Sequence, residues 1–230
     1  MKIALRALAG ACALIVAGSA LAIELKTEKD KNSYMVGMDI ARGIGPIKDE
    51  INVDVMMQAV KDSFAGSKMA LTDTEAQTLR GALQQKMAEK QQAERAAAVT
   101  KNKEEGDKFL AANKDKPGVK STASGLQYQV ITEGTGAQPK ANSQVKVHYR
   151  GTLLDGKTEF DSSYARNEPA TFALNQVIAG WTEGLQLMKA GSKYKFFIPS
   201  NLAYGENGQG PQIGPNAVLI FDVELLEVLN

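Results

Sequence analysis

The carboxyl-terminal half of this 230-residue chain strictly limits what the chain can fold into. From Leu126 onward, short apolar runs alternate with Gly, Pro and Asn turns, a pattern typical of antiparallel β-sheets. Large apolar residues recur within it, with one charged pair among them: Tyr149, Phe160, Val177, Ile178, Trp181, Tyr204, Ile213 and Phe221, with Asp161 and Arg166 as the pair. No evident nucleophile, metal cluster or acid–base couple accompanies them. We therefore expect a pocket that surrounds an apolar group and removes water from it.

This half of the chain is predicted to form an α+β domain. Each predicted strand alternates apolar and polar residues or is continuously apolar, over residues 126–131, 144–149, 194–198 and 217–225. One short helix is predicted over Ile178–Met188, ending at Ala190-Gly191. An antiparallel β-sheet wrapped on one short helix would bury the apolar face of both.

A long helix is predicted to precede this domain, over residues 72–115. Thr72 and Glu75 have the spacing of a capping box, so a helix should begin there. No proline follows until Pro117, and the apolar positions Leu79, Leu83 and Met87 give out into the polar run of residues 89–92. At 1.5 Å per residue the helix would be roughly 60 Å long and mostly solvated. A two-stranded coiled coil would need a sustained apolar heptad, which the sequence lacks.

Residues 23–71 are predicted to form a small all-α module. Two short helical patterns are separated by the breaker at residues 43–46, and both are too short to bury their apolar faces alone. Five methionines crowd this region: Met35, Met38, Met56, Met57 and Met69. Each could simply pack in a core, but as a group they suit an adaptable interface between two subunits. We favour an N-terminal homodimerisation module.

Residues 1–22 have the pattern of a secretory signal peptide. Lys2 and Arg6 precede an apolar run, and Ala20-Leu21-Ala22 forms a small-x-small cleavage site. The run is too short to span a membrane, and a lipid anchor at Cys12 would leave most of the run after the cysteine. Removal of the signal takes away two basic residues and leaves a net charge of about −1, which gives no reason to expect nucleic-acid binding. We expect an exported protein of the periplasm, outer membrane or cell surface.

Several motifs of the carboxyl-terminal half resemble the FKBP-type peptidyl-prolyl cis–trans isomerases. They follow in family order: residues 147–151 (VHYRG), 160–163 (FDSS), 177–184 (VIAGWTEG), 202–205 (LAYG) and 219–225 (LIFDVEL). The preceding parts resemble the macrophage infectivity potentiator (Mip) branch of this family. The resemblance makes residues 118–230 the FKBP-like isomerase domain, with no cofactor and no metal.

The resemblance also implies roles for the pocket residues. The prolyl ring of the substrate would lie on Trp181, and the catalytic group would also include Asp161, Tyr204, Phe221 and Tyr149. Tyr204 and the Ile178 N–H would hold substrate carbonyls, while Arg166 holds Asp161. Substrates or macrolides would further contact Phe160, Arg166, Val177, Ile178 and Ile213.

Two departures from the vertebrate pattern concern the rim of this pocket. Ala170 stands where an aromatic wall residue is common, and Gln209 stands where a histidine is usual in residues 205–214, the predicted flap beside the pocket. The pocket should be more open there, which leaves the affinity for rapamycin and tacrolimus an open question. His148, the only histidine, is predicted to be structural, on the opposite face of its strand from Tyr149.

The expected partners are unfolded or partly folded polypeptides that contain proline. In a V-shaped homodimer, two catalytic domains on long helices could embrace one client, which would give the protein chaperone character. The alternative is a non-catalytic holdase or adhesion protein that keeps the fold only as a scaffold. Intact Asp161, Tyr204 and Trp181 argue against that alternative, since a domain that only binds need not keep all three.

Overall fold

The computed structural model describes residues 23–229. The predicted signal peptide, residues 1–22 with Cys12, lies outside the described residues. The chain divides between Asp73 and Thr74 into two compact units. Within residues 23–229, no helix is both long enough and apolar enough to cross a membrane.

The described part of the first unit contains three consecutive helical segments. These are α1 (Glu28–Ile44), the 3₁₀ helix η1 (Gly45–Glu50) and α2 (Val53–Phe64). Thr27 caps α1 in a capping box, because its hydroxyl accepts from the Asp30 N–H at 3.1 Å and Asp30 accepts from the Thr27 N–H at 2.8 Å. The predicted breaker ends α1, since Pro46 follows its last residue closely.

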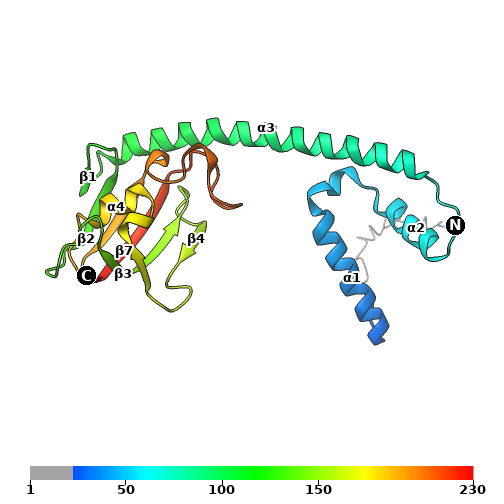
Figure 1. Ribbon diagram of the computed structural model, residues 1–230, viewed down its shortest axis with the longest axis horizontal. Coiled ribbons are helices and arrows are strands. Elements are labelled where there is room, and N and C mark those ends of the chain that lie inside the picture. The colour runs from blue at the N-terminus through cyan, green and yellow to red at the C-terminus, as the bar shows by residue number, and fades with distance from the viewer. Residues whose placement is uncertain (1–22, 230) are drawn as a thin grey trace, which may run out of the picture. The chain divides into compact units, whose positions relative to one another are not determined.

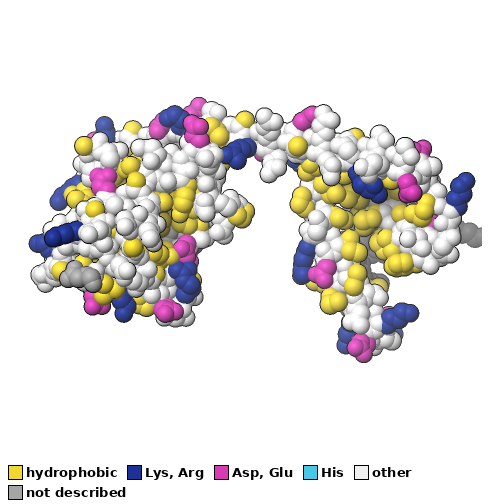
Figure 2. Space-filling model, in the orientation of Figure 1, with side chains coloured by type: hydrophobic (Ala, Val, Ile, Leu, Met, Phe, Trp, Pro, Cys, Tyr) yellow, Lys and Arg dark blue, Asp and Glu magenta, His cyan; other side chains and the backbone are white. Residues whose placement is uncertain are grey.

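Neither α1 nor α2 contains a buried residue. Large apolar side chains are instead exposed, and Figure 2 shows hydrophobic side chains gathered on the surface of these helices. A groove of about 840 Å³ runs between the helices and is lined mainly by such side chains, among them Val36, Ile40, Val53, Met57 and Phe64. The two helices therefore leave their apolar faces uncovered, as the short sequence patterns indicated.

The long helix α3 (Asp73–Asn113) begins at the boundary between the units, and all of it after Asp73 belongs to the second unit. It begins directly after Thr72, at the predicted cap, and most of its residues are exposed. Its carboxyl-terminal end is fastened to the sheet: the Asn113 amide donates to Gln127 Oε1 at 2.9 Å, and the Gln127 amide donates to the Leu110 carbonyl at 2.8 Å. The last turns of α3 thus pack on the domain that follows (Figure 1).

A seven-stranded antiparallel sheet forms the body of this unit, and the predicted α+β fold is confirmed. In spatial order the strands are β1, β2, β6, β7, β3 and β4, and β5 pairs with the first half of β3. Their bounds are β1 Val119–Ser121, β2 Gln127–Thr132, β3 Gln144–Thr152, β4 Glu159–Ser162, β5 Ala170–Ala173, β6 Lys193–Ile198 and β7 Leu219–Leu229. Short 3₁₀ helices lie between them: η2 Leu174–Gln176, η3 Ser200–Leu202 and η4 Gly205–Asn207.

The structure corrects the sequence prediction at several elements. Strands β1, β4 and β5 were not predicted, and β7 begins and ends later than the predicted 217–225. The helix α4 covers only Ala179–Leu185, because the Leu187 and Met188 N–H groups bond three residues back instead of four. Ile178 precedes α4 with φ of −58° and ψ of 149°, outside the helical region.

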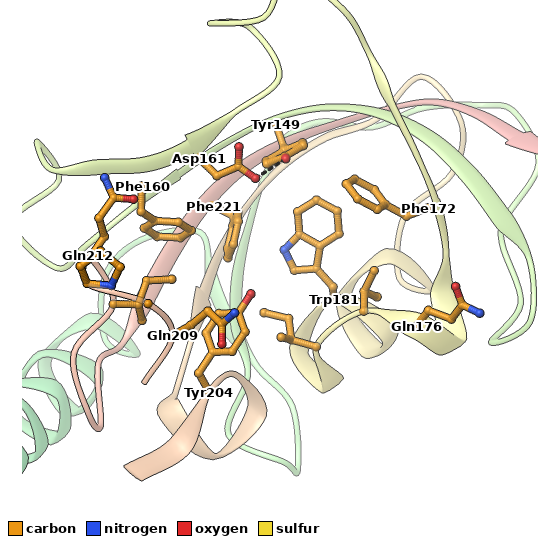
Figure 3. A pocket seen from close by; sticks show the side chains of 15 residues that line it. Tyr149, Phe160, Asp161, Phe172, Gln176, Trp181, Tyr204, Gln209, Gln212 and Phe221 are labelled. Carbon is orange, nitrogen blue, oxygen red and sulfur yellow. Dashed lines mark hydrogen bonds between the residues drawn. The ribbon is translucent and has the colours of Figure 1, made fainter. Parts of the chain in front are cut away.

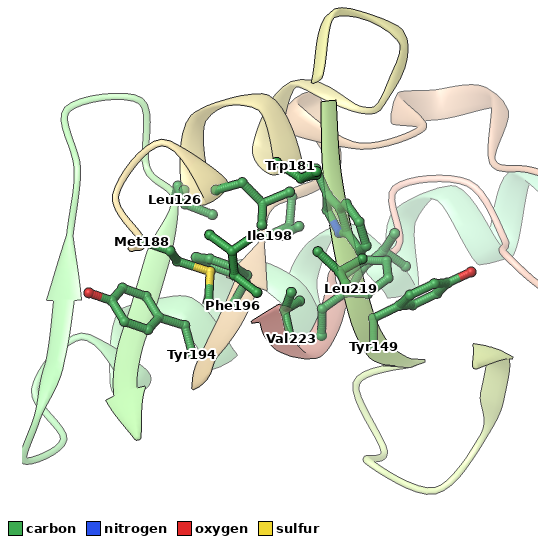
Figure 4. Packing of buried hydrophobic residues seen from close by; sticks show 14 of the residues in the cluster. Leu126, Tyr149, Trp181, Met188, Tyr194, Phe196, Ile198, Leu219 and Val223 are labelled. Atoms are coloured by element: carbon green, nitrogen blue, oxygen red, sulfur yellow. The ribbon is translucent and has the colours of Figure 1, made fainter. Parts of the chain in front are cut away.

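The core lies between α4 and the sheet (Figure 4). Two glycines allow this close approach, because a Cβ at Gly180 would lie 2.4 Å from Ile198 and a Cβ at Gly184 would lie 2.7 Å from Phe196. Fully buried apolar side chains surround the contact, including Leu126, Leu185, Met188, Leu219 and Leu225. The short helix is thereby held at a fixed height above the sheet, with Trp181 in its first turn.

Candidate active site

Strands β3 and β4 bring Tyr149 and Asp161 together. Gly151 pairs with Asp161 across the two antiparallel strands, two residues beyond Tyr149. The Tyr149 hydroxyl donates a hydrogen bond to Asp161 Oδ2. Arg166 completes the cluster, since its guanidinium donates to Asp161 Oδ1 at 2.5 Å and to the Tyr149 hydroxyl at 2.8 Å. Both oxygens of the carboxylate are therefore held in place.

The hydrogen bonds of this cluster decide its charge. Burial alone would raise the pKa of Asp161, but the hydrogen bonds from Tyr149 and Arg166 outweigh it and lower the pKa. The pKa of Arg166 is raised by its hydrogen bond to Asp161. Burial raises the pKa of Tyr149, and its hydrogen bond to Asp161 adds to the effect. At neutral pH the cluster thus consists of a carboxylate, a guanidinium and a neutral phenol.

Trp181 forms the floor of the site. Its side chain is 4% exposed and is met edge-on by three aromatic rings, those of Tyr149, Phe172 and Phe221, with ring centroids 5.2–5.4 Å from its own. Edge-to-face packing of this kind fixes the ring orientation. Among the described residues, the indole Nε1 is the buried side-chain polar atom without a hydrogen-bond partner.

These elements enclose a pocket of about 540 Å³ (Figure 3). Most of its wall is aromatic or aliphatic, and the lining residues are Tyr149, Phe160, Asp161, Phe172, Gln176, Val177, Ile178, Trp181, Tyr204, Gln209, Gly210, Pro211, Gln212, Ile213 and Phe221. Nine of the ten residues singled out from the sequence thus line one pocket. Arg166 does not line it and acts on it through Asp161 and Tyr149.

Two polar groups in this wall are available to a ligand. Figure 3 shows Tyr204 beside the pocket, opposite Asp161. Within residues 23–229, neither the Tyr204 hydroxyl nor the Ile178 N–H has a hydrogen-bond partner. Burial raises the pKa of Tyr204, and the charge of Asp161 adds to this, so the hydroxyl remains a donor at neutral pH.

Phe172 and Gln176 were not singled out from the sequence for the pocket wall, and Gly210, Pro211 and Gln212 were included only as part of the predicted flap. Phe172 could have been found, because it lies two residues after Ala170 on the same strand and therefore on the same face. It provides an aromatic ring against Trp181, although Ala170 itself does not line the pocket.

His148 lies away from the pocket. Its Nδ1 is 2.9 Å from Ser163 Oγ, and its ring stacks on Tyr164 with centroids 4.7 Å apart. Over the described part of the chain, no group of three or more His, Cys, Asp or Glu side chains is placed to hold a metal ion.

Comparison with known families covers nearly all described residues. A model described as FKBP-type peptidyl-prolyl cis–trans isomerase matches residues 135–226. A second model, described as the domain amino terminal to FKBP-type peptidyl-prolyl isomerase, matches residues 29–130. The second match includes all of α1 but its first residue, together with α2, α3, β1 and most of β2.

Individual relatives agree with the family models. The chain is 49% identical to the FKBP-type peptidyl-prolyl cis–trans isomerase FkpA of Aeromonas hydrophila, covering 89% of this chain and 78% of the relative. It is 42% identical to the outer membrane protein MIP of Legionella longbeachae, covering 99% and 97%. The crystal structure of FkpA from Escherichia coli superposes with a TM-score of 0.68 at 38% identity, covering 90% and 99%. On this evidence the chain belongs to the FKBP-type peptidyl-prolyl cis–trans isomerases, in the group that carries the amino-terminal helical domain.

Proposed function

We propose that this isomerase accelerates X–Pro isomerisation by removing water from the prolyl amide and stabilising its twisted form in the Trp181 pocket. The observation that carries the proposal is the combination of an aromatic pocket with a fixed carboxylate on its wall. No cofactor is required, because the reaction neither makes nor breaks a covalent bond.

The chemistry of the amide explains why such a pocket suffices. Twisting the bond destroys its resonance, and the barrier is about 20 kcal/mol. In the twisted state the C–N dipole is smaller than in the planar state, so an apolar environment favours the transition state over the ground state. Each ~1.4 kcal/mol of this preference accelerates the reaction tenfold.

The proposed roles follow the positions of the side chains. The prolyl ring would lie on the part of Trp181 that lines the pocket, within the aromatic walls. The Tyr204 hydroxyl and the Ile178 N–H, both without partners among the described residues, would donate to substrate carbonyls. Asp161 would face the carbonyl that rotates, and Arg166 and Tyr149 would keep its carboxylate oriented.

The remaining parts of the chain support a role in folding exported proteins. The uncovered apolar groove between α1 and α2 suits a second copy of the same chain, so we propose a homodimer formed through the first unit. A homodimer would hold two pockets for one unfolded client, which is the basis for chaperone-like binding. Export is supported by the sequence of residues 1–22 and by the name of the MIP relative.

The deciding experiment is the refolding of a proline-limited reporter protein with the wild type and with Asp161→Ala. We expect the wild type to accelerate the slow refolding phase. The acceleration by the variant should be about tenfold smaller, as expected when a hydrogen bond to a charged group is removed. Rapamycin should inhibit the wild type if it occupies the same pocket.

The matched control is Asp115→Ala, which removes an exposed aspartate of the same unit outside the pocket. It should refold the reporter at the wild-type rate. A correctly folded wild type that binds the unfolded reporter without accelerating its refolding would instead favour the holdase alternative.

A further inference from the structure

One face of α3 carries a regular series of residues at positions 95, 99, 102, 106, 109 and 113. Their spacing alternates between four and three residues, which places them in a single stripe along the helix. The series ends in the contacts of Phe109 and Asn113 with the sheet. Its earlier members contact residues 205–218, and these include the flap (residues 205–214), five of whose residues line the pocket.

Arg95 contacts the entry of the flap. Its guanidinium donates to Asn207 Oδ1 at 3.2 Å and, more weakly, to the Glu206 carbonyl at 3.4 Å. Both acceptors belong to η4, which directly follows Tyr204 in the chain. The stem that leads from Tyr204 into the flap is therefore bonded to the helix.

The exit of the flap is bonded to the same stripe, one and two turns further along. The Asn102 amide donates to the Pro215 carbonyl at 2.7 Å, and the Asn216 amide donates to the Val99 carbonyl at 3.3 Å. Asn216 adopts a left-handed conformation with φ of 54° and is 8% exposed. Its N–H donates to the Gly205 carbonyl at 2.9 Å, which closes the loop at its base.

The flap itself is stiffened between these stems. Gln209 and Ile213 exchange two backbone hydrogen bonds, of 2.8 and 3.2 Å, across the turn that they enclose. Figure 3 shows Gln209 and Gln212 at the rim of the pocket, on the side of the flap. A displacement of the stems would therefore move this rim as one piece.

Gly106 sets the distance between α3 and Val218, which follows the flap in the chain. A Cβ at this position would lie 2.7 Å from Val218 Cγ2, and Val218 is 5% exposed. Valine is short and β-branched, so it cannot swing away from an added methyl group. The close contact requires glycine in a helix where alanine would otherwise be favoured by about 1 kcal/mol.

We propose that α3 is a positioning element of the active site: its Arg95–Gly106 stripe holds both stems of the flap and so sets where residues 209–213 meet the substrate. The inference rests on the proposed function, because it assumes that substrate occupies the pocket beside the flap. Val99, Asn102 and Gly106 are positioning residues, since they reach the substrate only through the flap. The width of the pocket, and with it the preference for the residue before proline, then depends on a helix outside the sheet domain.

The test compares full-length variants at two positions of the stripe, Asn102→Ala and Gly106→Ala. KM and kcat are measured on peptides that differ in the residue before proline, and hydrogen exchange is measured on the segment 205–216. For Asn102→Ala we expect KM to rise about three- to tenfold, the effect of losing one hydrogen bond. Gly106→Ala, which pushes Val218 away from the helix, should raise KM as well. In both variants kcat should stay nearly unchanged, because the flap contacts ground state and transition state alike. The ranking of the peptides should change, and the Gln209 and Ile213 amides should exchange faster.

Two matched controls lie on the exposed part of α3. Gly81→Ala makes the same substitution as Gly106→Ala where a Cβ meets nothing within 4 Å, and Gln92→Ala removes an exposed amide. Both should behave as the wild type. Variants of Asn102 and Gly106 that only lower Tm, with unchanged KM, peptide ranking and flap exchange, would overturn the proposal. If the wild type itself is inactive on all peptides, the proposed function fails, while the exchange rates still decide whether α3 holds the flap.

Discussion

Asp161 is the residue whose charge the site controls most closely. Its carboxylate accepts from Tyr149 and Arg166, and these bonds lower its pKa although burial acts in the opposite direction. The charged form is therefore favoured in the folded protein, and the orientation of both oxygens is fixed. A carboxylate held this way can act on the substrate dipole without a free-energy cost of reorientation.

The pH dependence of activity follows from these directions. Because the pKa of Asp161 is lowered and those of Tyr149, Tyr204 and Arg166 are raised, no pocket group should change charge between about pH 5 and pH 9. We expect a flat profile of kcat/KM on a non-titrating peptide over this range. A step in the wild type with a midpoint near pH 6 or 7 would contradict the assignment.

The same shift predicts how the Asp161 cluster affects stability. A lowered pKa in the folded state means that the contribution is complete above the ordinary aspartate pKa and is lost as the pH falls through the lowered value. Unfolding of the wild type and of Asp161→Asn should therefore differ at neutral pH and converge in acid. Urea midpoints at a series of pH values measure this, and a difference that grew on acidification would have the wrong sign.

At the scale of elements, the contact between α4 and β6 fixes the floor of the pocket. Gly184→Ala adds a methyl group where a Cβ would lie 2.7 Å from the Phe196 ring, in a fully packed core. We expect the variant to lower the free energy of unfolding by about 1–3 kcal/mol, despite the better helix propensity of alanine. Gly81→Ala is the control and should be neutral or slightly stabilising. Equal urea midpoints for the two variants would show that α4 can move away from the sheet.

Strong local patterns allowed the long elements to be predicted, and their absence explains the missed ones. The helix α3 has a cap, helix-forming residues and no proline, so its start and extent were predicted within a few residues. By contrast, β1, β4 and β5 have three or four residues each and are defined only by pairing with β2 or β3. A strand of that length has too few positions to show an alternation of its own.

Ordered motifs account for most of the predicted residues on the pocket wall. Nine of the residues predicted for the site line the pocket, because their motifs follow in order along the chain and the fold brings these motifs to one place. The hydrogen bonds between α3 and residues 205–218 join residues that lie 111 to 117 positions apart, such as Arg95 with Glu206 and Asn216 with Val99. No local pattern specifies which residues meet across that separation, since these contacts depend on how α3 packs on the folded sheet domain.

At the scale of the whole molecule, the described part of the first unit, residues 23–73, has no core of its own. Its helices contain no buried residue, and Phe64 is 88% exposed and Val53 59% exposed. Burying an apolar side chain contributes roughly 1.5–3 kcal/mol, so such surfaces favour a partner that covers them. The apolar groove and the exposed methionines together explain why we propose a second copy of the chain as that partner.

Met57→Glu tests this assembly, because Met57 lines the groove and a charge there would be buried in a dimer. We expect the variant to be monomeric by sedimentation at concentrations where the wild type is a dimer. Its kcat/KM on short peptides should stay unchanged, since a peptide occupies one pocket, while refolding of a long client should slow. Ala59→Glu places the same charge on the same helix outside the groove and should remain dimeric. If both variants stay dimeric, the groove is not the interface. If Met57→Glu is monomeric but refolds the long client at the wild-type rate, one pocket is sufficient for the client, and the proposed benefit of two pockets is contradicted.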